Sequence, residues 1–278
     1  MTGELANGLL DDAAMFPPGS MALPDALVGH VGHRGAWYAD MLGPFVCAAG
    51  RLVTLQERAE QFGIQRLDVA VIVTDGLAAV DTALARAAAC PAVHVVALEV
   101  PIGPDQLDAA LRALVPRLAQ GCRIYVELPM TAITDRHAHD LSRAGLYLKL
   151  RTGGTSIEAF RTEAELARPI VLAAAERLAF KCTAGLHHAI RQLDRETGFE
   201  HHGFVNVLLA ARVAAASGSV DATAAVLSIR DRSEIVARAL ELATADIVAV
   251  RALFRSFGTC SILEPVTDLC SLGLVTAP

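Results

Sequence analysis

Two lysines stand in apolar, strand-like runs of the chain, and each run breaks into a turn that contains threonine and glycine. Lys149 lies in Leu-Tyr-Leu-Lys-Leu-Arg-Thr-Gly-Gly at 146–154, and Lys181 lies in Ala-Phe-Lys-Cys-Thr-Ala-Gly at 179–185. Removing an ammonium group from water costs several kcal/mol unless the group is paired or neutral. We therefore predict that the two amines share one pocket, an arrangement that makes a lysine nucleophilic near neutral pH.

Alternation along a strand indicates which side chains accompany these lysines, because residues two apart share a face. On that basis Tyr147 and Arg151 lie with Lys149. In the same way Thr183 lies with Lys181. Other ionisable residues stand where further strand-like runs end, namely Asp12, Arg51, Asp75, Glu99 and Glu127. We expect these side chains to surround one opening of the fold.

The composition supports one large core and argues against polyanionic partners. The chain has 278 residues, of which 53% are hydrophobic and 19% charged, and its net charge is −6. This charge argues against nucleic acid or an anionic membrane as the main partner. The six cysteines form no CxxC pair, which favours reduced thiols. With no transmembrane run and no recognisable signal peptide, we expect a cytoplasmic location.

The strand-like runs recur along the chain with amphipathic segments between them. We expect strands at 9–17, 44–51, 67–75, 93–100, 122–128, 145–151, 178–183 and 253–261. Segments such as 106–120 and 156–177 carry alanine and leucine at helical spacing. Eight strands alternating with helices predict an α/β protein with a (β/α)8 TIM barrel. A doubly wound open sheet often has a glycine fingerprint after its first strand, and none is present here.

One connection is much longer than the others. Between 183 and 253 the chain runs for about 70 residues, whereas ordinary connections in such folds are far shorter. We interpret residues 1–278 as one domain and about 186–250 as an extra helical insertion. This segment would cover the barrel mouth or form contacts between copies of the chain.

Taken together, the lysine motifs resemble those of the class I aldolase barrels, most of all the deoxyribose-phosphate aldolase group. That family has a Schiff-base lysine on strand six in Lys-Thr-x-Thr-Gly and a second lysine on strand seven in Lys-x-x-Gly-Gly. Lys149-Leu-Arg-Thr-Gly-Gly and Lys181-Cys-Thr-Ala-Gly take the corresponding places here. Arg255-Ser-Phe-Gly-Thr-Cys-Ser is similar to the family's phosphate-binding turn Arg-x-Gly-Thr-Ser, with one extra residue. The resemblance covers roughly the last four strands.

Three features depart from the family pattern. The family's acid on strand four has no clear match, although Glu99 could replace it. Leu186-His187-His188 follow the glycine after strand seven in place of the usual turn. The long segment that comes next has no counterpart in the family.

The resemblance implies a lyase that attacks a small carbonyl compound with Lys149 and forms a Schiff base, while Lys181 and Arg151 lower the pKa of Lys149. Proton transfer would fall to Asp12, Asp75, Glu99, Glu127, Tyr147 or His187. A substrate bearing phosphate or carboxylate would be bound by Arg51, Tyr147, Arg151, Thr183, Gly153, Gly154, Gly185, His188, Gly258, Thr259 and Ser261. We expect a small-molecule substrate, contacts between copies of the chain, no cofactor, no metal, and no nucleic-acid or membrane partner.

Three alternatives stay open at the level of sequence. Lys149 could form an ion pair with Glu127 across neighbouring strands, and Lys181 could pair with another carboxylate. The histidines at 187, 188, 201 and 202 could serve a metal-dependent hydrolase or lyase, although such sites need converging ligands. The barrel could also bind a metabolite without catalysis and use the lysines as plain charges.

Overall fold

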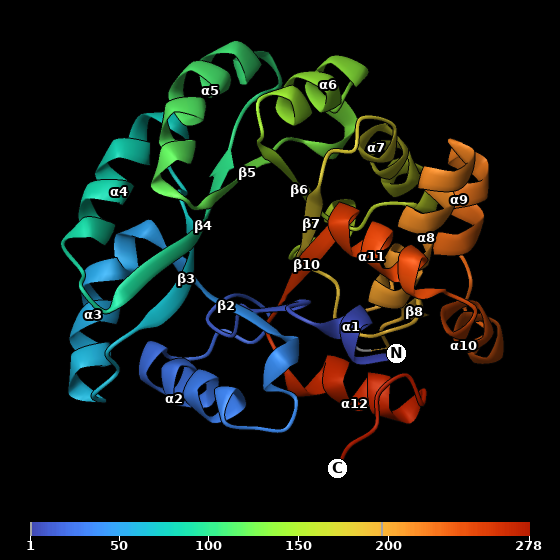
Figure 1. Ribbon diagram of the computed structural model, residues 1–278, viewed down its shortest axis with the longest axis horizontal. Helices are drawn as coiled ribbons and strands as arrows, with labels where there is room; N and C mark the ends of the chain where they lie inside the picture. The colour runs from blue at the N-terminus through green and yellow to red at the C-terminus, as the bar shows by residue number, and fades with distance from the viewer. Residues whose placement is uncertain (1, 196) are drawn as a thin grey trace.

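Eight parallel strands close into a barrel in the computed structural model, which describes residues 2–195 and 197–278 (Figure 1). The order around the barrel is β1-β2-β3-β4-β5-β6-β7-β10, and β10 closes onto β1. The strands are β1 (Leu10–Asp12), β2 (Leu42–Ala48), β3 (Leu67–Ile72), β4 (Val93–Pro101), β5 (Arg123–Glu127), β6 (Tyr147–Arg151), β7 (Phe180–Thr183) and β10 (Phe254–Thr259). The predicted (β/α)8 TIM barrel is confirmed, with several strands shorter than the sequence suggested.

The strands separate apolar from polar side chains as period-two alternation requires. Leu148 and Leu150 of β6 and Phe180 of β7 belong to the large core between barrel and helices. A second, small cluster inside the barrel contains Ala97 and Tyr125. Polar groups therefore enter the barrel interior, where they are shielded from solvent.

Helices follow most strands and pack around the barrel. They are α1 (Thr2–Ala6), α2 (Leu23–Arg34), α3 (Leu52–Gln61), α4 (Val80–Ala88), α5 (Leu107–Leu114), α6 (Asp135–Arg143), α7 (Glu163–Ala175), α8 (Phe204–Ser217), α9 (Val220–Leu227), α10 (Arg232–Leu240), α11 (Thr244–Leu253) and α12 (Leu263–Ser271). Short 3-10 turns are η1 (Ala39–Met41), η2 (Ala49–Arg51), η3 (Leu77–Ala79), η4 (Pro104–Gln106), η5 (Val115–Gln120), η6 (Met130–Ala132) and η7 (Ile157–Ala159). Among the described residues, no helix has the length and apolar character that crossing a membrane requires.

Local signals determine where the predicted helices begin and end. In α7 the Thr162 side chain accepts a hydrogen bond from the Glu165 backbone N–H, and Glu165 accepts one from the Thr162 N–H. This reciprocal cap starts the helix at Glu163, several residues after the start of the amphipathic pattern. The predicted segment 106–120 is helical as α5 and then tightens into η5, which has Pro116 in its first turn.

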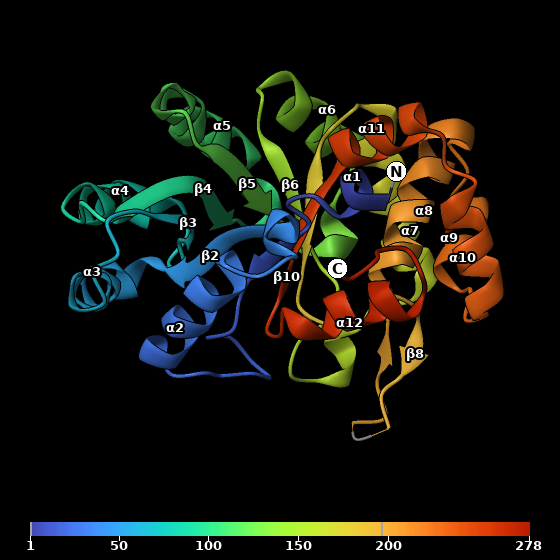
Figure 2. The same cartoon turned by 60° about the horizontal axis from the view of Figure 1, so that its bottom comes forward.

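The long connection after β7 contains a hairpin and four helices. The hairpin pairs β8 (Gln192–Leu193) with β9 (Glu200–His201) in antiparallel fashion. Helices α8 and α9 pack on α7, and α11 packs on α8 and β10, so the helices cover one flank of the barrel (Figures 1 and 2). The hairpin reaches the carboxyl-terminal loops, because His201 stacks on Phe160 and lies near His187. A role of this segment in contacts between copies stays a prediction.

Candidate active site

Both lysines lie inside the barrel on neighbouring strands. In the register of β6 and β7, Lys149 is opposite Lys181, and each residue is only 1% exposed. They are also the only two lysines of the chain, whose 24 basic residues otherwise consist of 22 arginines. The chain thus places lysine only where the side chain is withdrawn from water.

One carboxylate joins the two amines. Glu99 Oε2 lies 2.7 Å from Lys149 Nζ, and Glu99 Oε1 lies 2.5 Å from Lys181 Nζ. Glu99 stands near the carboxyl end of β4, which is three strands away from β7 around the barrel. Because each oxygen of one carboxylate binds a different amine, both ε-nitrogens lie in the same buried charge cluster.

The network continues from Lys149 towards the carboxyl-terminal mouth of the barrel. Glu127 Oε2 lies 2.8 Å from Lys149 Nζ, and Glu127 Oε1 lies 2.7 Å from Arg151 Nε. The side chain of Glu127 is 13% exposed, and that of Arg151 is 51% exposed. The ion pair between Lys149 and Glu127, which was one of the alternatives open from the sequence, is therefore present. Through Arg151 this pair is connected to solvent.

From Lys181 the network runs the other way, towards the amino-terminal end of the barrel. Lys181 Nζ donates to Asp11 Oδ2 at 2.5 Å, and Ser256 Oγ donates to the same oxygen at 2.9 Å. The Tyr125 ring centroid lies 5.5 Å from Lys181 Nζ. Lys181 therefore binds two carboxylates and faces an aromatic ring.

The resulting charge network consists of Asp11, Lys181, Glu99, Lys149, Glu127 and Arg151. Three cations and three carboxylates alternate along it, so the formal charges cancel. Such balance is what allows ionised groups to persist in a buried site.

The pKa shifts agree with an ionised network. Burial alone would raise the pKa of Glu99, but the charges and hydrogen bonds of Lys149 and Lys181 lower it to about 2. The pKa of Glu127 is also lowered, since Lys149 and Arg151 outweigh the effect of burial. For Lys181, burial acts to lower the pKa, but Asp11 and Glu99 raise it overall. Near neutral pH Glu99 and Glu127 are therefore carboxylates, and Lys181 is an ammonium.

Asp12 lies outside the charge network, and its predicted role in proton transfer stays a prediction. Its Oδ2 lies 2.9 Å from His30 Nδ1, and its Oδ1 accepts a hydrogen bond from the Ala14 N–H. Neighbouring residues of a strand point to opposite faces, so Asp12 turns towards α2 while Asp11 points into the barrel. Asp11 therefore takes the place in the network that we expected for Asp12.

Asp75 and Arg51 also differ from expectation. Strands β3 and β2 end at Ile72 and Ala48, earlier than predicted, so both residues lie in the segments that follow. Both are exposed, and among the described contacts neither joins the charge network. Their predicted catalytic and substrate-binding roles stay predictions.

The glycines after β6 and β7 allow two loops to pack closely. A Cβ on Gly153 would lie 2.9 Å from Gly185 Cα and 2.8 Å from the Phe160 ring, and a Cβ on Gly154 would lie 2.7 Å from Ala159 Cβ. The Thr152 hydroxyl donates to the Ala184 carbonyl. These contacts hold the two lysine strands together at the mouth, whereas anion binding by the glycine N–H groups stays a prediction.

Three other predicted substrate-binding residues lie at the end of β10. The Thr259 hydroxyl donates to the Ser261 carbonyl at 2.8 Å and accepts from the Ser261 N–H at 3.3 Å. Gly258 lies next to half-buried Thr183 across the β10–β7 pair. The turn is thus organised by its own hydrogen bonds beside the mouth.

Tyr147 packs inside the barrel against Tyr125, with ring centroids 5.1 Å apart. It is half-buried on the same face of β6 as Lys149. This position agrees with the predicted alternation and places the ring against Tyr125, which faces Lys181.

His187 and His188 diverge after β7. His187 Nδ1 lies 3.4 Å from Glu264 and 3.6 Å from Cys260 Sγ, and burial lowers the pKa of His187. His188 Nδ1 lies 3.1 Å from Asp268 Oδ2, and this hydrogen bond raises the pKa of His188. Both therefore contact α12 or the turn before it, and catalytic or binding roles for them stay predictions.

His201 and His202 also face different partners. His201 stacks on Phe160 with centroids 4.7 Å apart. His202 Nε2 donates to the Arg161 carbonyl, and Arg191 donates to His202 Nδ1. Burial and then the charge of Arg191 lower the pKa of His202 to about 4. Across residues 2–195 and 197–278, no three His, Cys, Asp or Glu side chains group as a metal-ligand set.

Sequence reasoning missed Asp11, Tyr125 and Ser256. Tyr125 shares a face of β5 with Glu127, and Ser256 shares a face of β10 with Gly258, so alternation from the residues already chosen would have found both. Asp11 had no such signal, because a three-residue strand is too short to show a period.

Comparisons with known proteins support the fold. No protein-family model matches the chain, and no curated protein matches its sequence. Among solved structures, the tetrameric deoxyribose phosphate aldolase from Aeropyrum pernix superimposes with a TM-score of 0.51 and 15% sequence identity. The match covers 98% of this chain and 93% of that one. The chain therefore shares the TIM-barrel fold of that enzyme over almost its whole length, beyond the four strands that carried the motifs.

Proposed function

We propose that this protein is a lyase of the class I aldolase type, which acts on a small carbonyl compound through a Schiff base on Lys149. The observation that carries the proposal is that the only two lysines of the chain are buried, lie side by side and share Glu99. The fold of the Aeropyrum pernix enzyme supports the same conclusion.

The choice of lysine over arginine has chemical meaning at these two positions. Arginine is the better partner for buried ion pairs, and its guanidinium does not lose its proton in proteins. A chain with 22 arginines would meet a purely structural need with that residue. Lysine differs in that its amine can release a proton and become a nucleophile.

The first step of the proposed reaction makes the amine neutral. Lys149 passes one proton to Glu127, whose Oε2 lies 2.8 Å from Nζ. The nitrogen lone pair then bonds to the carbonyl carbon. The carbonyl oxygen leaves as water and takes one proton from the amine and one from Glu127. The iminium keeps the positive charge that the ammonium had, so the charge balance beside Glu99 is preserved.

The iminium then acts as an electron sink. When the carbon–carbon bond breaks, its electron pair enters the iminium and forms an enamine, while the hydroxyl of the departing fragment gives its proton to a base. Glu127 and Tyr147 are our candidates for this base, since Glu127 contacts Lys149 and Tyr147 lies on the same face of β6 as Lys149. Lys181 stays charged between Asp11 and Glu99 and keeps Glu99 ionised.

Lys149 is our choice for the nucleophile because its side of the charge network reaches solvent at the carboxyl-terminal mouth. Its partner Glu127 contacts the half-exposed Arg151 at the carboxyl-terminal mouth, where enzymes with this fold bind substrates. Arg151 would hold a phosphate or carboxylate of the substrate. By analogy with the tetrameric neighbour, we also propose that copies of this chain associate.

Reductive trapping tests the Schiff base directly. The folded protein is incubated with acetaldehyde and cyanoborohydride, and the ethylated residue is located by peptide mass spectrometry. Surface lysines cannot obscure the result, because the chain has none. We expect labelling of Lys149, and its loss in Lys149→Arg, which preserves the charge. Labelling of Lys181 alone, or of neither lysine until the protein is unfolded, would refute the proposal.

A non-catalytic metabolite-binding barrel is the second candidate, and one observation favours it. Each lysine already binds two carboxylates, which is what a purely structural charge would do. Under this alternative Lys149→Arg would retain ligand binding, and the wild-type protein would show no trapped imine.

A further inference from the structure

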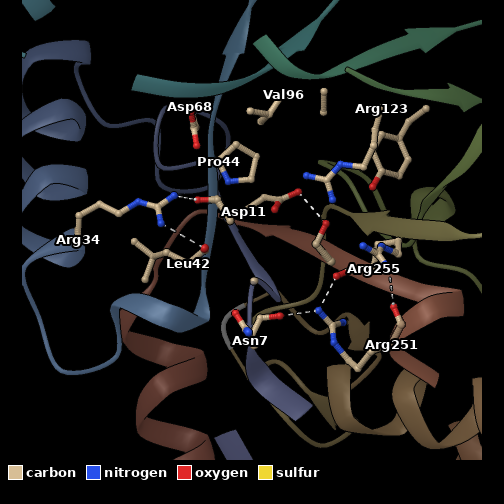
Figure 3. A pocket seen from close by; sticks show the side chains of 15 residues that line it. Asn7, Asp11, Arg34, Leu42, Pro44, Asp68, Val96, Arg123, Arg251 and Arg255 are labelled. Carbon is tan, nitrogen blue, oxygen red and sulfur yellow. Dashed lines mark hydrogen bonds between the residues drawn. The ribbon is translucent and has the colours of Figure 1, made fainter. Parts of the chain in front are cut away.

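A second site candidate lies at the end of the barrel opposite the mouth. A half-open cavity of about 400 Å³ is lined by residues from the amino-terminal halves of several strands and by Asn7 and Arg251 near them (Figure 3). Its volume falls within the range of small-molecule sites. Active sites of this fold are built at the carboxyl-terminal ends of the strands, so this cavity is distinct from the proposed reaction site.

Four arginines line this cavity, namely Arg34, Arg123, Arg251 and Arg255. Among the described residues, none of the four lies within ion-pair distance of a carboxylate, whereas many other arginines of the chain do. Their positive charge therefore has no counter-charge on the protein in direct contact. Clustered guanidinium groups without carboxylates are an anion-binding arrangement.

Backbone carbonyls hold three of these arginines in place. Arg34 donates to two carbonyls of β2, Arg251 donates to three carbonyls near the cavity, and Arg255 donates to the Arg251 carbonyl. Neutral acceptors fix the geometry of a guanidinium but leave its charge unbalanced. Burial and the charge of Arg255 lower the pKa of Arg251 to about 10, which agrees with an excess of positive charge.

Arg123 is different because its guanidinium is not held. It extends into the cavity from the first residue of β5 (Figure 3), and within the described part of the chain it makes no hydrogen bond or ion pair. Side-chain donors with no acceptor in a half-buried position are available to a ligand.

The two carboxylates that line the cavity already have partners. Asp68 binds Arg66 and His94 at the surface. Asp11 binds Lys181 and Ser256 through Oδ2, while its buried Oδ1 has no hydrogen-bond partner among the described residues. When the charges of both carboxylates are subtracted from those of the four arginines, a formal charge of +2 remains. This charge would balance that of a phosphate monoester, which is close to −2 near neutral pH.

We propose that this amino-terminal cavity binds a small phosphate-bearing molecule through Arg123 and its three neighbouring arginines. The Tyr125 and Ser256 side chains, which also line it, would contact the rest of the ligand. The proposal is independent of imine chemistry at Lys149.

The site has a direct route to the charge network. Asp11 lines the cavity and binds Lys181 on its other side, and Lys181 binds Glu99. A phosphate bound beside Asp11 would repel its carboxylate and alter this chain of contacts. This second step rests on the proposed function: with the reaction at Lys149, the ligand would act on it from the amino-terminal end of the barrel, as an effector and not as a substrate.

Calorimetry with inorganic phosphate tests the site, with chloride at equal ionic strength as the reference. We expect saturable binding to the wild type and a loss of affinity of about tenfold or more in Arg123→Gln. Arg136→Gln, which changes an arginine that is 66% exposed and outside the cavity, should bind phosphate as the wild type does. Equal affinity of wild type and Arg123→Gln would overturn the proposal, as would an absence of saturable binding.

Two further measurements distinguish the cavity from the barrel mouth as the place where phosphate binds. The variant Arg151→Gln tests the mouth. If Arg151→Gln loses phosphate binding while Arg123→Gln keeps it, the anion binds at the reaction site, and the proposal for the cavity is refuted. In the wild type, phenylglyoxal modification read by mass spectrometry needs no variant. Phosphate should protect Arg123 from the reagent and leave Arg136 reactive, and unprotected Arg123 would contradict the proposal.

Discussion

Lys149 and Lys181 are opposite each other in the register of β6 and β7, and their ammonium groups bind the two oxygens of the same carboxylate, that of Glu99. This relationship couples the lysines electrostatically without direct contact. A change in the charge of one amine alters the electrostatic environment of the other through Glu99, which is itself only 1% exposed.

Removing the shared carboxylate should destabilise the fold strongly. Glu99→Gln leaves two buried cations with one carboxylate fewer, and breaking a buried ion pair in this way costs about 3–5 kcal/mol. Denaturant unfolding would measure the loss. Asp108→Asn, which breaks an exposed pair with Arg136, is the matched control and should change the free energy of unfolding by less than about 1 kcal/mol. Equal effects of both variants would show that the network contributes no more than a surface pair.

The network should stabilise the protein over a defined range of pH. The pKa of Glu99 falls from 4.5 to about 2 on folding, so its contribution is present above pH 4.5 and is lost as the pH falls through about 2. The pKa of Lys181 is raised from 10.5, so its contribution is complete below pH 10.5 and is lost as the pH rises through the folded value. Unfolding midpoints measured across this range should fall at both ends. In Glu99→Gln the acid limb should be shallower, and an unchanged limb would contradict the assignment.

Strand β2 passes so close to Asp11 that position 43 should accept only glycine. A Cβ on Gly43 would lie 2.0 Å from Asp11 Oδ1, so Gly43→Ala would force Asp11 away from Lys181 and Ser256. We expect a loss of about 1–3 kcal/mol in the free energy of unfolding, as for other overpacked cores. Gly50→Ala is the control, because no atom lies within 4 Å of a Cβ there. A wild-type unfolding curve for Gly43→Ala would show that Asp11 is not held as described.

Thiol reactivity should report how tightly the barrel is closed. Cys47, Cys90, Cys122 and Cys182 are buried, while Cys260 and Cys270 are half-buried. Burial raises the pKa of Cys47 to about 12, which suppresses the reactive thiolate. Ellman's reagent should therefore titrate no more than two thiols rapidly in the native protein and all six in denaturant. A third fast thiol would reveal opening of the core.

Much of the fold follows from local sequence patterns. Buried parallel strands need runs of apolar residues, and the run Leu-Asp-Val-Ala-Val-Ile at β3 is recognisable without any partner. Strand ends are harder to predict: β2 and β3 end at Ala48 and Ile72, so Arg51 and Asp75 lie in the loops after the strands and not on them.

The centre of the site was also predictable. Lys149, Lys181, Glu99 and Glu127 do meet, because alternation within a strand is a local property and parallel strands bring like faces together. Their chemical roles stay predictions until trapping identifies the reacting amine.

By itself, the sequence determined the barrel, the strands that carry the amines and the inward face of each, since period-two alternation and apolar runs depend only on neighbouring residues. Tertiary structure alone decided that Asp11 and not Asp12 completes the network, because three residues show no period and only closure of β10 onto β1 brings Asp11 to Lys181. It also decided that Arg34, Arg123 and Arg251 line one cavity. Residues so far apart in the chain meet only when the first and last strands of the barrel join.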